Sequence, residues 1–223
     1  MILPRHFYNR PTLDVARDLI GKVLVHETRA GVSSGVIVEV EAYIGEGDPA
    51  CHAAPGPTRR NAPLYGPPGI AYVYLNYGIH CLVNAVTEAE GWPAAVLIRA
   101  LEPKHGVPLM RRRRRALRPV ENLRVASSRV AGPQRSGQAP ARPSALKPDD
   151  LCRGPGNLTK ALGIDLTHNL LDLTAGPLRI EDHKEPARPV AWSPRIGISV
   201  GVEPEWRVIA TDSHGVSGPR RRL

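Results

Sequence analysis

A candidate base and several aromatic rings lie close together in the N-terminal half of the sequence. Glu41 follows an apolar strand pattern and precedes a long loop, which places its carboxylate at the end of a strand. An isolated strand carboxylate usually faces solvent, as we expect for Glu39. Glu41 differs because its neighbours offer polar groups that orient a base and rings that stack on a flat ligand. These neighbours are His52 and five of the six tyrosines, namely Tyr43, Tyr65, Tyr72, Tyr74 and Tyr77.

The segment 71–77 contains three of these tyrosines and alternates like a strand. The alternation places Tyr72 and Tyr74 on one face, and a buried aromatic sheet face explains that pattern as well as a binding surface does. Tyr77 differs because Gly78 follows it and predicts a tight turn. A bulky aromatic side chain that projects from such a turn can act as a wedge between bases.

The Cys and His residues do not have the spacing of a metal site. His52 follows Cys51 and His80 precedes Cys81, but neither pair has a second pair at the usual interval. We therefore expect no bound metal. Because neither a Walker A sequence nor a dinucleotide fingerprint occurs, we also expect no cofactor.

A glycine-rich turn precedes a short helical stretch near the middle of the second half. The backbone N–H groups of Gly154, Gly156 and Asn157 can contact a phosphate there, because the start of a helix favours anions. An ordinary helix entry explains the same residues equally well. Both interpretations stay open from the sequence.

The order of the elements predicts an α+β fold. Helices are expected over 12–20 and 158–162, each followed by glycine. Strands are expected over 22–26, 35–41, 71–77, 79–87, 94–101, 178–181, 196–200 and 206–211. Since strands do not alternate regularly with helices, we expect a single domain over residues 1–223. Its architecture should be a mostly antiparallel curved β-sheet with short helices, and not a doubly wound fold.

The positive charge is concentrated in one segment and one tail. The chain has 30 basic and 21 acidic residues, a net charge of +9. Residues 104–150 alone carry +9, residues 220–222 carry +3, and the rest of the chain sums to −3. We expect residues 111–150 to form a basic, flexible insertion and 213–223 a basic tail. The run Arg111–Arg115 can form a short helix. Its charges are either simply solvated or make contacts with phosphates whose affinity falls with salt.

The composition also excludes several classes of protein. No apolar run approaches the roughly 18 residues of a membrane span, and the N-terminus lacks the apolar region of a signal peptide. Three cysteines are too few for a disulfide framework, so we expect a cytoplasmic protein. The excess of positive charge points to an acidic partner, and a nucleic acid is the first candidate.

Several short motifs are spread along the chain. They are Val38-Glu39-Val40-Glu41-Ala42-Tyr43, His52, Pro68-Gly69, Tyr72-Val73-Tyr74, Tyr77-Gly78, Asn84, Val96-Leu97-Ile98-Arg99-Ala100-Leu101-Glu102-Pro103 and Leu151-Cys152-Arg153-Gly154-Pro155-Gly156-Asn157-Leu158. Taken jointly, these motifs resemble the alkyladenine (3-methyladenine/hypoxanthine) DNA glycosylase family, and the bias toward Arg, Ala, Gly and Pro favours a bacterial member. The resemblance runs from about Thr12 to Asp212 and is interrupted by the basic segment, which is longer than we expect for the family.

The resemblance implies a catalytic pair and a wedge. Glu41 matches the general base of the family, and Arg99 matches a basic residue near the catalytic water and the backbone of the target nucleotide. Tyr77 matches the residue at the tip of a DNA-inserting β-hairpin, which fills the gap left by the extruded nucleotide.

The resemblance also implies a base pocket. Tyr43 and Tyr74 match aromatic residues that sandwich the flipped base, with His52 as a stacking or hydrogen-bonding partner. Asn84 matches the residue whose side chain opposes the amino group of a normal guanine.

These matches imply an enzyme of base-excision repair that acts as a monomer in the cytoplasm, on the double-stranded DNA of the nucleoid. It would remove alkylated or deaminated purines by hydrolysis, namely 3-methyladenine, hypoxanthine, etheno-adenine and 7-methylguanine. All five lysines lie outside the catalytic motifs, so we expect a monofunctional enzyme without lyase activity, which leaves an abasic site. The alternative is a non-catalytic nucleic-acid or lesion-binding protein.

Overall fold

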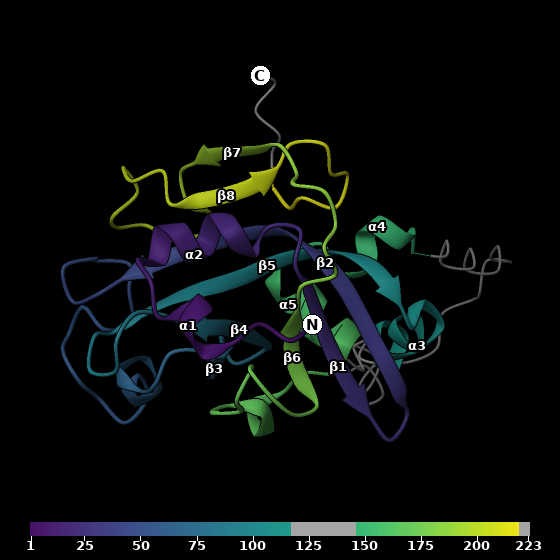
Figure 1. Ribbon diagram of the computed structural model, residues 1–223, viewed down its shortest axis with the longest axis horizontal. Helices are drawn as coiled ribbons and strands as arrows, with labels where there is room; N and C mark the ends of the chain where they lie inside the picture. The colour runs from purple at the N-terminus through teal and green to yellow at the C-terminus, as the bar shows by residue number, and fades with distance from the viewer. Residues whose placement is uncertain (117–145, 219–223) are drawn as a thin grey trace, which may run out of the picture.

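An antiparallel sheet of eight strands forms the frame of the protein (Figure 1). The structure is a computed structural model that describes residues 1–116 and 146–218. The strands are β1 (Val23–Thr28), β2 (Gly31–Ile44), β3 (Ala71–Asn76), β4 (His80–Val86), β5 (Ala94–His105), β6 (Leu178–Glu181), β7 (Val190–Ser193) and β8 (Arg207–Ala210). Their order is β3-β4-β5-β2-β1-β6, with β8 pairing both β2 and β7. The curved antiparallel sheet of an α+β domain is confirmed.

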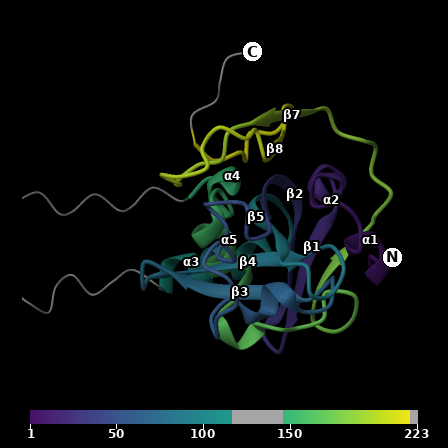
Figure 2. The same ribbon diagram turned by 90° about the vertical axis from the view of Figure 1, so that its left-hand side faces the viewer.

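Short helices cover both faces of this sheet. They are α1 (Arg5–Tyr8), α2 (Thr12–Leu19), α3 (Val107–Ala116), α4 (Pro148–Leu151) and α5 (Pro155–Leu162), with 3-10 turns η1 (Ala62–Tyr65) and η2 (Leu166–His168). Helix α2 packs on one side of β2 and β5, whereas α5 packs on the other side against β4 and β5 (Figure 2). Both helices bury an apolar stripe, as amphipathic helices on a sheet do. The sheet therefore has no open face at its centre.

Strand β2 is long enough to pair with two different strands along the same edge. Its first half pairs with β1 over 31–36, and its second half pairs with β8 over 39–41. On the other edge it pairs with β5, and there the register skips Val38 on β2 and Arg99 on β5. A bulge of this kind bends a strand and re-aims the side chain of the extra residue. Arg99 is thereby directed toward the acidic residues of β2.

The expectation that Glu39 faces solvent is wrong. The carboxylate is fully buried, as are Ile37, Val38, Val40 and Glu41 around it. The reason is that β8 pairs beside this part of β2, and the segment 213–218 covers it. Alternation along a strand predicts a solvent-exposed face only when no other element packs on that face.

Two elements near the C-terminal end also differ from expectation. The segment 196–200 is a loop and not a strand, although its apolar residues alternate, because Gly197 takes a positive φ of 78°. The strand β7, which lies between Pro189 and Pro194, was not predicted. Prolines at its ends are typical of an edge strand, and they concealed the short pattern.

The basic segments are only partly described. Arg111–Arg115 lie on helix α3, and the side chain of Arg113 donates to the Leu162 carbonyl at 2.6 Å. The remainder of the expected insertion, 117–145, lies outside the described residues, as do residues 219–223 of the expected tail. Residues 213–218 pack on the sheet, with Val216 only 3% exposed. In the described residues, no helix has the length and apolar character needed to cross a membrane.

A pair of histidines joins the sheet to the turn η2. The Nε2 atoms of His26 and His168 are 3.0 Å apart, and Nδ1 of His26 lies 2.9 Å from the Leu162 carbonyl oxygen. Because a carbonyl only accepts, Nδ1 of His26 carries a proton, and its Nε2 must accept from His168. Burial holds the pKa of His26 below its ordinary value of 6.5, and the charges of His168 and Arg113 lower it further, although the hydrogen bond to the Leu162 carbonyl opposes them.

This histidine pair predicts a loss of stability in mild acid. A lowered pKa in the folded state means that the unfolded chain binds the proton more tightly, so the contribution of His26 is present above 6.5 and is lost as pH falls below it. We expect the free energy of unfolding of the wild type to fall between pH 6.5 and pH 5 by up to about 1.4 kcal/mol per pH unit. His26→Gln should flatten that slope in urea titrations. Equal slopes for both proteins would contradict the assignment.

Candidate active site

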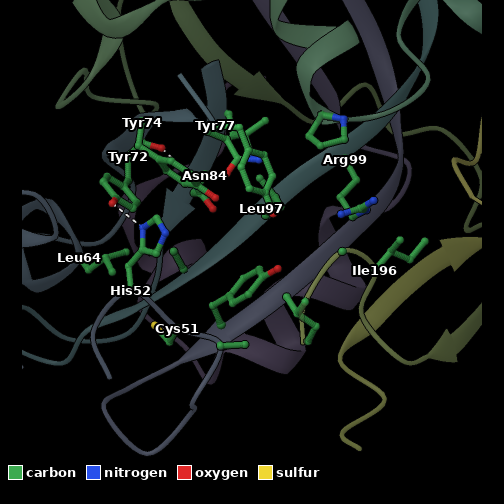
Figure 3. A pocket seen from close by; sticks show the side chains of 18 residues that line it. Cys51, His52, Leu64, Tyr72, Tyr74, Tyr77, Asn84, Leu97, Arg99 and Ile196 are labelled. Carbon is green, nitrogen blue, oxygen red and sulfur yellow. Dashed lines mark hydrogen bonds between the residues drawn. The ribbon is translucent and has the colours of Figure 1, made fainter. Parts of the chain in front are cut away.

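A cavity of about 360 Å³ opens where β3, β4 and β5 meet the loops around residues 50 and 196 (Figure 3). One side carries aromatic and amide groups, namely His52, Tyr72, Tyr74 and Asn84, and the other side carries Arg99 and Ile196. The fold thus brings together strands that are far apart in the sequence. The size and the flat walls suit a planar ligand with the dimensions of a base.

The aromatic wall is a set of three mutually contacting rings. Nδ1 of His52 and the hydroxyl of Tyr72 are 2.8 Å apart. The ring of His52 meets that of Tyr74 edge to face, with centroids 4.4 Å apart, and the rings of Tyr72 and Tyr74 are 5.2 Å apart. Burial, and secondly the charge of Arg60, lower the pKa of His52. The same-face expectation for Tyr72 and Tyr74 is confirmed, and Tyr72, for which the resemblance implies no role, also belongs to the wall.

Asn84 lies directly across the hairpin from Tyr72. The two residues pair in the register of β3 and β4, and the Asn84 side chain donates to the Tyr72 carbonyl at 2.9 Å. Asn84 is 4% exposed and lines the cavity. Its amide is therefore fixed in orientation before any ligand enters.

Glu41 lies immediately behind the cavity wall, and its carboxylate is fully buried. Oε1 accepts from the backbone N–H of Ile196 at 2.7 Å. Oε2 accepts from the Tyr43 hydroxyl at 2.9 Å and from Nη1 of Arg99 at 3.0 Å. All three partners line the cavity, so the carboxylate is one side chain away from a bound ligand. Because the Ile196 N–H faces one oxygen and the Arg99 guanidinium faces the other, and both can only donate, the position suits a carboxylate and no amide.

A second buried carboxylate anchors Arg99. Glu39 accepts from Nε of Arg99 and from Nε of Arg207, both at 2.8 Å, and from the N–H and hydroxyl of Ser217 at 2.6 and 2.9 Å. Burial raises the pKa of the Glu39 carboxyl, but the two guanidinium groups outweigh burial and hold that pKa below its ordinary value. Arg99 thereby bridges both carboxylates. No local pattern predicts the contacts of Arg207 and Ser217 with Glu39, because these residues are 168 and 178 positions away from it along the chain.

The hairpin tip stands at the mouth of the cavity. Tyr77 is 83% exposed and has a φ of 49°, and Gly78 follows with a φ of 69°. The N–H of Ile79 donates to the Asn76 carbonyl at 3.0 Å and closes the turn. Two successive positive φ values match the twist of a tight hairpin. The fold therefore presents Tyr77 to solvent beside the cavity, as the expected wedge requires.

The glycine-rich turn lies beside His80, close to the tip of the same hairpin. Gly154 precedes α5, and the Asn157 side chain donates to the Arg153 carbonyl at 2.7 Å. At Gly156 a Cβ atom would lie 2.8 Å from the ring of His80, so close packing alone requires glycine there. The phosphate contact of these residues stays a prediction. Within the described ranges, no cluster of three His, Cys, Asp or Glu side chains is arranged to hold a metal ion.

The comparisons with known proteins agree with this geometry. The model of the methylpurine-DNA glycosylase (MPG) family matches residues 6–214. A protein of Rubrobacter xylanophilus is 46% identical over 207 residues, which is 92% of either chain. A protein of Methanocella arvoryzae is 43% identical over 220 residues, 97% of this chain and 96% of that one. Both carry the name "Putative 3-methyladenine DNA glycosylase".

The chain belongs to the methylpurine-DNA glycosylase family. By family it is a DNA glycosylase, a hydrolase of N-glycosyl bonds that acts in DNA repair. The expected resemblance is confirmed over nearly the full chain.

Proposed function

We propose that this chain is a monofunctional glycosylase that flips damaged purines out of duplex DNA and releases them by hydrolysis. Its substrates would be 3-methyladenine, hypoxanthine, etheno-adenine and 7-methylguanine. The observation that carries the proposal is the buried Glu41 carboxylate, held by three donors directly behind a cavity walled by aromatic rings. A protein that only bound lesions would not need a buried carboxylate there.

Flipping comes first, because a base inside a duplex cannot reach a cavity of this kind. Unstacking costs a few kcal/mol, and least for a damaged or mispaired base. The exposed ring of Tyr77 can offset this cost by filling the gap in the stack. In the cavity, Tyr43 and Tyr74 offer stacking surfaces worth about 1–3 kcal/mol per base. A cationic alkylated purine is attracted further by electron-rich rings.

Hydrolysis then proceeds through a sugar with oxocarbenium character. Glu41 accepts a proton from a water molecule that attacks the anomeric carbon, and its negative charge stabilises the developing positive charge. Arg99 fixes Oε2 of Glu41 through a hydrogen bond of 3.0 Å, and the Ile196 N–H fixes Oε1. The purine leaves with the bonding electrons. A 3-methylated adenine is a good leaving group and needs little help from an acid.

The lysines support a mechanism without a covalent intermediate. A lyase needs an amine nucleophile beside the sugar. In the part of the chain that the structure describes, no lysine lines the cavity, and the amino group of Met1 bonds the Asp182 carbonyl. Release of the base should therefore leave the DNA strand intact.

The direct test is single-turnover base release from duplexes that each carry one lesion. We expect free base by chromatography and strand breaks only after alkali treatment, with no adduct trapped by borohydride. Binding of a lesion duplex without base release from any of them would favour the non-catalytic alternative. A trapped adduct would contradict the monofunctional assignment.

The wedge is tested by Tyr77→Ala. Because Tyr77 is 83% exposed, we expect the free energy of unfolding to change by less than about 0.5 kcal/mol. Excision from a fully paired duplex should fall about tenfold or more, since unstacking costs a few kcal/mol that the ring no longer offsets. A lesion in a mismatch or in single-stranded DNA should lose much less. An equal loss on all these substrates would show that Tyr77 acts elsewhere.

A further inference from the structure

A buried ion pair joins two loops that form opposite parts of the cavity wall. Arg195 and Asp48 have side chains that are 0% and 1% exposed, and they meet through two bonds, Nη1 to Oδ2 at 2.5 Å and Nη2 to Oδ1 at 2.8 Å. Arg195 immediately precedes the loop residues 196–198, which line the cavity, and Asp48 precedes 50–52, which also line it. The two loops are thus bound to each other behind the wall.

The same guanidinium is bonded to the strand that carries the base. Nη1 of Arg195 donates to the carbonyl of Ala42 at 3.0 Å, and Ala42 lies between Glu41 and Tyr43. Nη2 donates to the carbonyl of Gly201 at 2.8 Å, which secures the far end of the loop. Since the next residue, Ile196, gives its N–H to Oε1 of Glu41, any shift of Arg195 moves a donor of the catalytic carboxylate.

Arg195 also lies between two aromatic rings. Its guanidinium carbon is 4.8 Å from the centroid of Tyr43 and 5.0 Å from that of Trp206. The ring of Tyr43 is one of the stacking surfaces of the cavity, and its hydroxyl donates to Glu41. A cation stacked on a ring in a buried place holds that ring in one orientation.

We infer that Arg195, paired with Asp48, is a positioning residue that aligns the general base and the Tyr43 ring. This inference rests on the proposed function. Two of the three donors on Glu41 are set by Arg195, the Ile196 N–H through the backbone and the Tyr43 hydroxyl through the stacked ring. The third donor, Arg99, has its own anchor in Glu39. Misplacement of catalytic groups by about 1 Å costs on the order of 100-fold in rate.

The test separates alignment from stability. Arg195→Met leaves Asp48 buried and unpaired, which by itself destabilises the fold. The double variant Arg195→Met with Asp48→Asn removes both charges and should recover much of the thermal stability. Arg188→Met is the matched control, because Arg188 also bonds both oxygens of one carboxylate, Glu102, but lines no part of the cavity.

We measure the melting temperature, the affinity for lesion duplex and the single-turnover rate at saturating enzyme. We expect the double variant to bind DNA within about threefold of the wild type and to react about 100-fold more slowly. Arg195→Lys should recover about tenfold of that loss in single-turnover rate, because lysine keeps the positive charge and one hydrogen bond to Asp48. Arg188→Met should lower the melting temperature with little change in rate.

Any of three outcomes would overturn the inference. The first is a rate of the double variant that recovers together with its stability, and the second is a rate of Arg195→Met equal to that of the wild type. The third is that neither variant folds, which would assign the pair to the fold alone. Absence of base release by the wild type itself is a separate result. It would refute the proposed function, and the inference would fall with it.

Discussion

Glu41→Gln is expected to lower the single-turnover rate of base release by about 10³-fold, within the 10²–10⁴-fold range of general-base catalysis. The variant should still bind lesion duplex, because Glu41 lies behind the cavity wall and the wall residues are unchanged. The amide also turns its N–H₂ group toward a group that can only donate, either the Ile196 N–H on one side or the Arg99 guanidinium on the other. Some loss of stability should therefore accompany the loss of rate.

The matched control is Glu46→Gln. Glu46 lies five residues further on in an exposed loop, where its carboxylate accepts from the Tyr65 hydroxyl at 2.8 Å. We expect its rate and its melting temperature to match those of the wild type. The base assignment fails if Glu41→Gln, measured below its melting temperature, releases base as fast as the wild type.

The largest loss of stability is expected for Glu39→Gln. This change leaves Arg207 without a buried counter-charge and removes the anchor of Arg99, while Ser217 loses an acceptor. Breaking a buried ion pair by removing one partner costs about 3–5 kcal/mol. Glu102→Gln is the comparison, because the Glu102 side chain is 34% exposed and the loss of its pair with Arg188 should cost about 1 kcal/mol or less. Urea unfolding measures both.

Glu39 also predicts acid sensitivity. Its pKa in the folded state is lower than the ordinary value of 4.5, so its contribution to stability is complete above 4.5 and is lost as pH falls toward the folded value. The wild type should lose stability steeply below pH 4.5, and Glu39→Gln should lose less over the same interval. Parallel curves would show that Glu39 is not the group that titrates. Excision by the variant should also be slow, since Arg99 no longer has two partners.

How much of this site the sequence could predict differs from residue to residue. Tyr72 and Tyr74 follow from strand alternation, and Tyr77 follows from the glycine after it, because both signals are local. The proposed role of Glu41 as general base follows from the family resemblance, since a carboxylate on a strand is common and carries no specific signal. Two of its three partners, Arg99 and Ile196, are 58 and 155 residues away along the chain.

The contacts that the sequence did not predict share one cause. Arg99 reaches the acidic residues through compensating skips in the register of β2 and β5, and no local pattern announces a bulge. Glu39 is buried by elements more than 160 residues away. The loop 196–198 resembles a strand by alternation. Its place in the cavity wall depends on the hydrogen bond from Ile196 to Glu41 and on the ion pair between Arg195 and Asp48. Pairwise contacts at such separations depend on the tertiary fold and not on neighbouring residues.

The contact between Glu39 and Ser217 has a consequence for how the protein is made. The two residues are 178 positions apart, so the buried network cannot close until the chain has been synthesised as far as residue 217. At roughly 5–20 residues per second, translation separates the two residues by about ten to thirty-five seconds. During that interval Glu39 lacks its Ser217 donors, and the long separation predicts slow final folding. A nascent chain that has not reached residue 217 therefore lacks part of the buried network that anchors Arg99.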